Sequence, residues 1–195
     1  TPCINTPISN IVFAVGGTAT GASATGLPPG VTGVYSAGAF TLSGTPNTAG
    51  TYNYTITTSG TCSSVTATGT ITVKAAPTAV LSGSQIICGG TATLSMAVTG
   101  SGTLSGTLLP GNIPFSGTAP SISVNVSPSA TTTYTIGTLT NGGCNPSGTD
   151  ISGSATITVP SGTPGLWTGL ADNDWFNCRN WADGKVPTIS VDVTI

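Results

Sequence analysis

The sequence predicts an all-β protein in which two tandem β-sandwich domains precede a short tryptophan-rich β segment. Three observations lead to this prediction: the composition suits strands, a set of landmarks repeats once along the chain, and no helical period of 3.6 residues persists for long. Short candidate strands separated by glycine- and proline-rich turns are typical of a sandwich rather than of alternating strands and helices.

Threonine, glycine and serine dominate the composition, and charged residues are rare. Only 4% of the 195 residues are charged, whereas about a quarter is usual in soluble domains. The mean hydropathy is +0.31 and the net charge is −2, so the chain has enough apolar surface to bury a core. Threonine, valine, isoleucine and tyrosine suit half-buried strands, so this composition favours an all-β globular protein.

Four landmarks of the first half of the chain recur in the same order in the second half. The segment TATGTITVK at 66–74 is matched by SGSATITVP at 152–160, and AGTYNYTIT at 49–57 is matched by ATTTYTIGT at 130–138. Two cysteines also have counterparts, and the four shifts lie between 81 and 86 residues. We therefore expect one duplicated folding unit.

Prolines mark the expected ends of both units. Pro77 and Pro160 follow alternating, threonine-rich stretches and cannot donate to a strand ladder, so they end strands and stiffen the junctions. We predict a first domain over 1–75, a second over 76–160 and a separate segment over 161–195.

Alternation of apolar and polar residues between turn-forming stretches predicts the strands of each domain. One side of each strand should face the core and the other should face solvent. The expected strands cover 8–15, 39–43, 50–58 and 65–73 in the first domain, and 79–82, 91–98, 103–108, 121–126, 131–138 and 154–159 in the second.

The last stretch of the chain differs from both repeats. Residues 165–195 hold all three tryptophans and four of the five acidic residues. About 31 residues are too few for a core of their own, so we expect the opening of a third module or a cap on the second domain. The alternating run at 190–195 predicts a final strand.

The five cysteines predict disulfides rather than a metal site, because none forms a C-x-x-C pair and the chain has no histidine. Similar spacings of 59 and 56 residues predict one bridge in each domain, Cys3–Cys62 and Cys88–Cys144, with buried free thiols as the alternative. Each bridge would stabilise its domain by roughly 4 kcal/mol and would imply an oxidising compartment. Cys178 has no obvious mate in the sequence, which leaves its partner open, a cysteine beyond Ile195 included.

Several function classes are excluded by what the sequence lacks. Without histidine or glutamate there is no Ser–His–Asp triad, Cys–His pair or zinc cluster, so we predict no enzyme and no cofactor. Three cations give no basic patch for nucleic acid. No apolar run is long enough to predict a membrane span.

Clustered carboxylates at Asp172 and Asp174 are weak candidates for a calcium site, because hard cations take oxygen ligands. The sequence around them lacks the pattern of an EF-hand loop. The preferred interpretation is a polar turn before Trp175.

The aromatic residues allow two interpretations in each half of the chain. Trp167, Trp175 and Trp181 are weak candidates for a carbohydrate-binding platform, but packing within the terminal segment is preferred. Tyrosines near the start of the matching strands are candidates for a tyrosine corner or for ordinary core residues. These tyrosines are Tyr52, Tyr54 and Tyr134.

Residues 26–57 (GLPPGVTGVYSAGAFTLSGTPNTAGTYNYTIT) resemble the immunoglobulin-like repeat of bacterial surface proteins, with its Gly-Leu-Pro-x-Gly, Ser/Thr-Gly-Thr-Pro and Ala-Gly-Thr-Tyr pattern. The second domain is similar to repeats of large Bacteroidota adhesins, including gliding-motility adhesins of the SprB type. The stretch WTG…DNDWFNCRNW…VP…VTI is similar to segments near the end of such proteins. The resemblance implies immunoglobulin-like sandwiches, export by type IX secretion and display on the cell surface, with no catalytic residue.

We therefore expect a structural or adhesive stalk fragment of a secreted surface adhesin, used in gliding motility or surface attachment. The alternative is a carbohydrate-binding or spacer module of a secreted multidomain enzyme, and a third reading is docking to the export machinery. The expected partners are neighbouring repeats, surface polysaccharide, or export and motility proteins, and not nucleic acid or a membrane.

Overall fold

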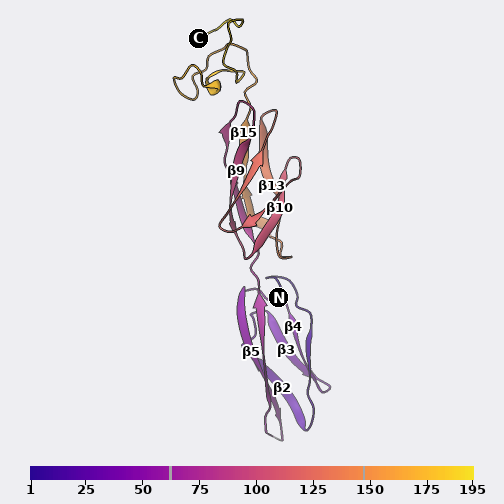
Figure 1. Cartoon of the computed structure of the whole chain (residues 1–195). Helices are drawn as coiled ribbons and strands as arrows, with labels where there is room; N and C mark the ends of the chain where they lie inside the picture. Colours follow the sequence, from indigo (N-terminus) through magenta and orange to yellow (C-terminus); the bar gives the residue numbers. More distant parts are fainter. Residues whose placement is uncertain (62, 147) are drawn as a thin grey trace. The chain divides into compact units, whose positions relative to one another are not determined.

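The structure is a computed structural model that describes residues 1–61, 63–146 and 148–195. The chain forms two compact units, Thr1–Ala76 and Pro77–Ile195 (Figure 1). Both units are built from strands, and the only helical elements in the described ranges are two short 3₁₀ turns. The predicted class, tandem immunoglobulin-like β-sandwiches, is confirmed.

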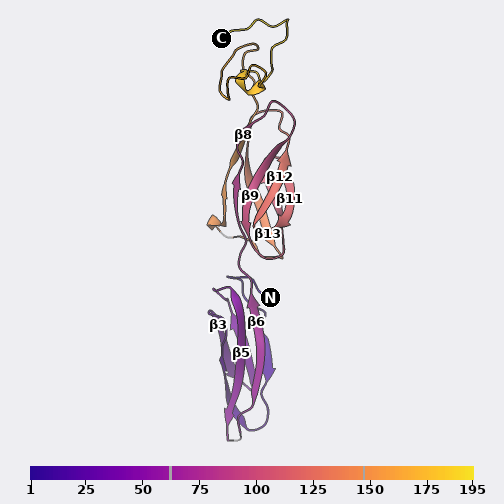
Figure 2. The ribbon, with the colours of Figure 1, turned by 60° about the vertical axis from the view of Figure 1, so that its left-hand side comes forward.

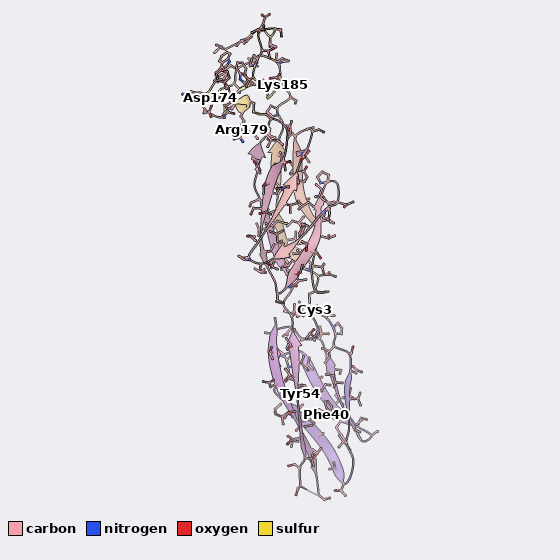
Figure 3. All side chains as sticks on the ribbon, viewed as in Figure 1. Cys3, Phe40, Tyr54, Asp174, Arg179 and Lys185 are labelled. Atoms are coloured by element: carbon pink, nitrogen blue, oxygen red, sulfur yellow. A yellow bond between two sulfur atoms is a disulfide. The ribbon has the colours of Figure 1, made fainter. Side chains whose placement is uncertain are left out.

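The first unit packs two three-stranded antiparallel sheets face to face. Its core consists of side chains that alternate along the strands, with Phe40 and Tyr54 labelled inside it in Figure 3. One sheet has the order β1 (Ile11–Ala14), β4 (Ala39–Gly44), β3 (Val31–Ser36), and the other has the order β2 (Ala19–Thr25), β5 (Gly50–Gly60), β6 (Thr66–Val73).

The pairing of β5 with β6 illustrates why this sequence forms a sandwich. Tyr54 and Ile56 of β5 are buried, whereas the intervening Thr55 points away from the core. Tyr54 lies opposite Gly69 of β6, and its ring occupies the space that a Cβ at Gly69 would need. The aromatic side chain thus covers a glycine that would otherwise weaken the strand.

The second unit is a larger sandwich of a five-stranded and a four-stranded sheet (Figure 2). The five-stranded sheet has the order β11 (Ile113–Thr118), β10 (Thr103–Leu109), β13 (Thr132–Asn141), β15 (Ala155–Thr158), β8 (Gln85–Ile86). The four-stranded sheet has the order β12 (Ser121–Val126), β9 (Ala92–Thr99), β7 (Thr78–Ser82), β14 (Ile151–Gly153), and η1 (Gly148–Asp150) precedes β14.

The first two strands of this unit belong to different sheets. β7 pairs antiparallel with β9, and β8 pairs parallel with the final strand β15. Between the sheets lies a continuous core that includes Leu94, Met96, Leu104 and Ile157, each almost fully buried. The alternating burial of β9 and β12 follows the sequence pattern residue by residue.

All ten strands expected for the two domains are present, with ends shifted by up to three residues. The structure adds β2, β3, β8, β11 and β14. The expected strand at 190–195 is wrong, because this stretch makes only a single bridge between Leu166 and Thr194.

Residues after the second sandwich form an irregular segment with one 3₁₀ turn, η2 (Cys178–Asn180), and belong to the same compact unit as that sandwich. Among the described residues, no helix is long and apolar enough to cross a membrane.

Candidate functional site in the tryptophan-rich segment

A disulfide attaches the tryptophan-rich segment, here residues 165–195, to the second sandwich. Cys88, just after β8, is bonded to Cys178 at the start of η2, with a Cα–Cα distance of 6.2 Å. The partner of Cys178, which the sequence left open, is therefore Cys88 and not a cysteine beyond Ile195. The prediction that Cys88 pairs with Cys144 is wrong as well.

Strand register explains why Cys88 and Cys144 are not paired. Ile87 donates its N–H to the carbonyl of Thr158, so Cys88 lies at the end of the sheet where β13 begins. Cys144 follows the far end of β13, where it bridges Asn141. The ten residues of β13 span roughly 33 Å, whereas a disulfide needs Cα atoms within about 7 Å.

The remaining cysteines give a partial result. Cys3 and Cys144 are both disulfide-bonded. The predicted Cys3–Cys62 bridge involves Cys62, which lies outside the described residues.

Asn180 organises the backbone of the segment from a fully buried position. Its side-chain oxygen accepts the N–H groups of Ala171 (2.8 Å) and Asp172 (3.1 Å). Its amide nitrogen donates to Asp172 Oδ1 at 2.7 Å and to the carbonyl of Asp174 at 2.9 Å. One short side chain therefore holds the whole 171–174 turn, and sequence reasoning missed it because a buried asparagine has no distinctive pattern.

The three tryptophans pack on one another beside this turn. Trp181 is 1% exposed and meets Trp167 and Trp175 edge to face, with ring centroids 5.0 and 4.6 Å away. Its indole N–H donates to the carbonyl of Trp175 at 2.9 Å. Trp167 and Trp175 are stacked at 5.6 Å. The cluster is the small core of the segment, as the preferred interpretation has it.

One side of this aromatic cluster is open to solvent. Trp175 is 38% exposed, and the neighbouring Phe176 and Leu170 are 77% and 76% exposed. An exposed aromatic ring offers an apolar face on which a ligand such as a sugar ring can stack. Of the three tryptophans, Trp175 is the most exposed, Trp167 is half-buried and Trp181 is buried.

Asp172 and Asp174 cap the same turn. Asp172 Oδ1 accepts the N–H of Asp174, and Oδ2 accepts the side-chain amide of Asn177 at 2.7 Å. The bond from the Asp174 backbone, followed by those from Asn177 and Asn180, holds the pKa of Asp172 below its usual value. Asp174 in turn accepts the N–H of Phe176.

This geometry is that of a polar turn, with both carboxylates engaged in local hydrogen bonds. Figure 3 shows Asp174 and the cations Arg179 and Lys185 within the same segment. In the described ranges, no group of three or more histidine, cysteine or acidic side chains is placed to hold a metal ion.

The tyrosines separate into two roles. Tyr52 donates its hydroxyl to the carbonyl of Thr48, four residues upstream, at 3.2 Å, which is the contact of a tyrosine corner. Tyr54 and Tyr134 are core residues. Burial raises the pKa of Tyr134.

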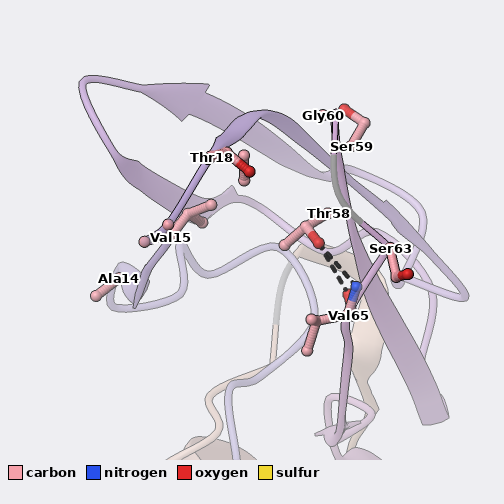
Figure 4. Close-up of a pocket in the computed structure, with 11 residues that line it drawn as sticks. Ala14, Val15, Thr18, Thr58, Ser59, Gly60, Ser63 and Val65 are labelled. Carbon is pink, nitrogen blue, oxygen red and sulfur yellow. Dashed lines mark hydrogen bonds between the residues drawn. The ribbon is translucent and has the colours of Figure 1, made fainter.

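The first unit also has a hollow of about 440 Å³ (Figure 4). Its lining side chains are small, apolar or hydroxyl-bearing, among them Val15, Ser63 and Val65. The hydroxyl of Thr58 accepts the N–H of Val65 at 2.9 Å and so closes one wall. With no charged group among its lining residues, this hollow offers less for recognition than the aromatic cluster.

The fold is similar to that of tandem immunoglobulin domains in solved structures. The I-band fragment I67–I69 of titin matches with a TM-score of 0.61 at 14% identity, over 85% of this chain and 65% of that one. A Glu-to-Ala variant of the same three domains matches with a TM-score of 0.59 at 14% identity, over 80% of this chain and 61% of that one. The chain thus spans slightly less than two thirds of both titin fragments. No family model and no curated protein sequence matches it.

Proposed function

We propose that this chain is a structural and adhesive stalk module of a secreted bacterial surface protein. The observation that carries the proposal is the direct succession of two immunoglobulin-like sandwiches, with the first unit ending at Ala76 and the second beginning at Pro77. Such tandem arrangements serve as spacers or as repeated weak binding units whose avidity exceeds a single affinity.

The chemistry of the described residues supports this role. Disulfide-bonded cysteines persist in oxidising compartments, which favours a secreted or extracellular location. The outer sheet faces carry paired hydroxyl groups in place of charges, such as Thr133 with Thr156 and Thr107 with Thr138, both at 2.9 Å. These paired hydroxyls keep the strand surfaces polar without the strong electrostatic field that charged side chains would create.

The finer assignment rests on the sequence resemblance described above. We propose that the parent protein is a Bacteroidota adhesin of the gliding-motility type that leaves the cell by type IX secretion. Its partners would be neighbouring repeats and a surface polysaccharide or motility protein. No enzymatic activity is proposed.

Antibody labelling and a bead assay test the proposal. An antibody raised against this fragment should label intact cells, and the label should disappear after brief protease treatment of the cell surface. Beads coated with the fragment should adhere to polysaccharide-coated glass more strongly than beads coated with a two-domain titin fragment. Labelling only after cell lysis would contradict the location, and equal bead retention would contradict the adhesive role.

The alternative, a carbohydrate-binding module of a secreted enzyme, draws support from the open ring of Trp175 and the adjacent Phe176. A glycan array provides the test. Binding that is lost in Phe176→Ala, which removes an exposed ring outside the stacked cluster, would favour this alternative. An array without hits would remove it.

A further inference from the structure

A hollow of about 460 Å³ lies within the second unit, where the sandwich meets the tryptophan-rich segment. Cys88, which is bonded to Cys178, forms part of its wall. Asp183 and Lys185 are the charged residues among its described lining residues, and Asp183 Oδ1 accepts the backbone N–H of Lys185 at 3.2 Å. The hollow therefore combines a disulfide-bonded cysteine with one residue of each charge.

The disulfide is more open to solvent at Cys88 than at Cys178. Cys88 is exposed, whereas Cys178 is half-buried. Gly89 and Gly90 follow Cys88, and a Cβ at either position would have no atom within 4 Å other than those of its chain neighbours. The rate at which a thiolate attacks a disulfide depends on access to the sulfur, so we expect attack at the sulfur of Cys88.

The tryptophan-rich segment has internal contacts that do not depend on this bond. The four side-chain hydrogen bonds of Asn180 and the bond donated by the Trp181 indole N–H all join residues of the segment to one another. Toward the sandwich, Gly184 lies against the ring of Pro160. Opening the disulfide would therefore leave a folded segment that is attached to the sandwich through residues 161–164.

We propose that a small zwitterionic thiol enters this hollow, reduces the Cys88–Cys178 bond and so releases the segment from the sandwich. An amino-acid thiol such as free cysteine carries an ammonium group that complements Asp183 and a carboxylate that complements Lys185. A thiol with neither charge lacks this attraction. The disulfide is then a latch on the segment that a thiol opens.

The exchange takes two steps. The thiolate first attacks the sulfur of Cys88 and forms a mixed disulfide with it, and Cys178 leaves as a thiolate that takes up a proton. A second thiol then attacks the small-molecule sulfur of the mixed disulfide, and Cys88 leaves and is protonated in the same way. Two thiols are thus oxidised to one small-molecule disulfide, while the protein gains two electrons and two protons.

The latch goes beyond the proposed stalk role, because it requires neither an adhesive ligand nor display on a cell. Reduction kinetics of the full chain test the entry site. The chain is incubated with free cysteine or with the neutral thiol mercaptoethanol, thiols are alkylated at intervals, and mass spectrometry follows Cys88 and Cys178 separately from the other cysteines. The ratio of the two rates, compared between variants, cancels the intrinsic reactivity of each thiol.

Lys185→Gln and Asp183→Asn should each lower this ratio by about two- to fivefold, the range of a solvent-exposed charge pair. Lys74→Gln removes a lysine of the first unit, outside the hollow, and should leave the ratio unchanged. A ratio that is unchanged in both hollow variants, or that falls equally in Lys74→Gln, would overturn the entry site.

Tryptophan fluorescence anisotropy tests the release of the segment, because all three tryptophans lie in it. Free cysteine should lower the anisotropy, while circular dichroism shows that the strands persist around their continuous core. The double variant Cys88→Ser/Cys178→Ser should have the lower anisotropy from the start and should not respond to cysteine. Three results would contradict the latch: an unchanged anisotropy once the bond is open, unfolding of the sandwich, or an equal response in the double variant.

Discussion

At the scale of single residues, Asn180 decides the conformation of the tryptophan-rich segment. It is fully buried and makes four side-chain hydrogen bonds to residues 171–174. We expect Asn180→Ala to destabilise the segment by about 1–3 kcal/mol, because two backbone N–H groups and the Asp172 carboxylate lose their partner. All three tryptophans lie in this segment, so denaturation followed by tryptophan fluorescence measures it selectively.

Asn173→Ala is the control for that measurement. Asn173 lies in the same turn but is exposed, and no described hydrogen bond involves its side chain. The control should unfold like the wild type. Equal destabilisation by both variants would mean that the side-chain hydrogen bonds of Asn180 do not hold the turn.

The lowered pKa of Asp172 makes the same turn sensitive to acid. A carboxylate whose pKa is lower in the folded than in the unfolded chain contributes stability above its ordinary pKa, and this contribution is lost as the pH falls through the folded value. We expect the tryptophan fluorescence of the segment to change below about pH 4, the ordinary aspartate range. Asp172→Asn should remove this titration. An unchanged acid transition in that variant would show that another group is responsible.

At the scale of elements, the pair β5–β6 depends on the fit of Tyr54 over Gly69. A Cβ at position 69 would collide with the tyrosine ring, so we expect Gly69→Ala to destabilise the first unit by about 1–3 kcal/mol. Differential scanning calorimetry resolves this as a lower melting temperature of that unit. The double variant Gly69→Ala/Tyr54→Leu should lose less stability than the sum of the losses in the two single variants, because both changes act on one contact. Strict additivity would rule out the clash.

Sequence pattern predicted those elements whose alternation is strong and missed those whose alternation is weak. Polar and apolar residues alternate strictly along β12, and the predicted strand has the same first and last residues as the observed one. β2 consists of alanine, glycine, serine and threonine, and β8 has two residues, so neither gives an apolar period. β14 is placed by its parallel pairing with β7, which is a tertiary contact that local sequence does not encode.

The candidate site was predicted only in part. The tryptophan cluster and the polar turn follow from residue type, since aromatic side chains seek burial and Asp-x-Asp favours turns. The central role of Asn180 depends on hydrogen bonds to residues six to nine positions away. The Cys88–Cys178 pairing depends on which end of the sheet each cysteine occupies, and spacing alone does not determine this.

At the scale of the whole molecule, the Cys88–Cys178 bond encloses every strand from β9 to β15 in one covalent loop, with a sequence separation of 90. A loop of this length restricts the unfolded chain, and its removal should cost the second unit roughly 4 to 5 kcal/mol in the chain-entropy model. Cys88 is exposed, so a reductant can also reach the bond.

We expect Cys88→Ser, Cys178→Ser and the double variant to lower the melting temperature of the second unit equally, because each removes the same bond. Calorimetry of the unit, combined with tryptophan fluorescence, separates loss of the sandwich from loss of the attached segment. If the double variant is much less stable than either single variant, the two cysteines act independently and the bond is not the source of the stability.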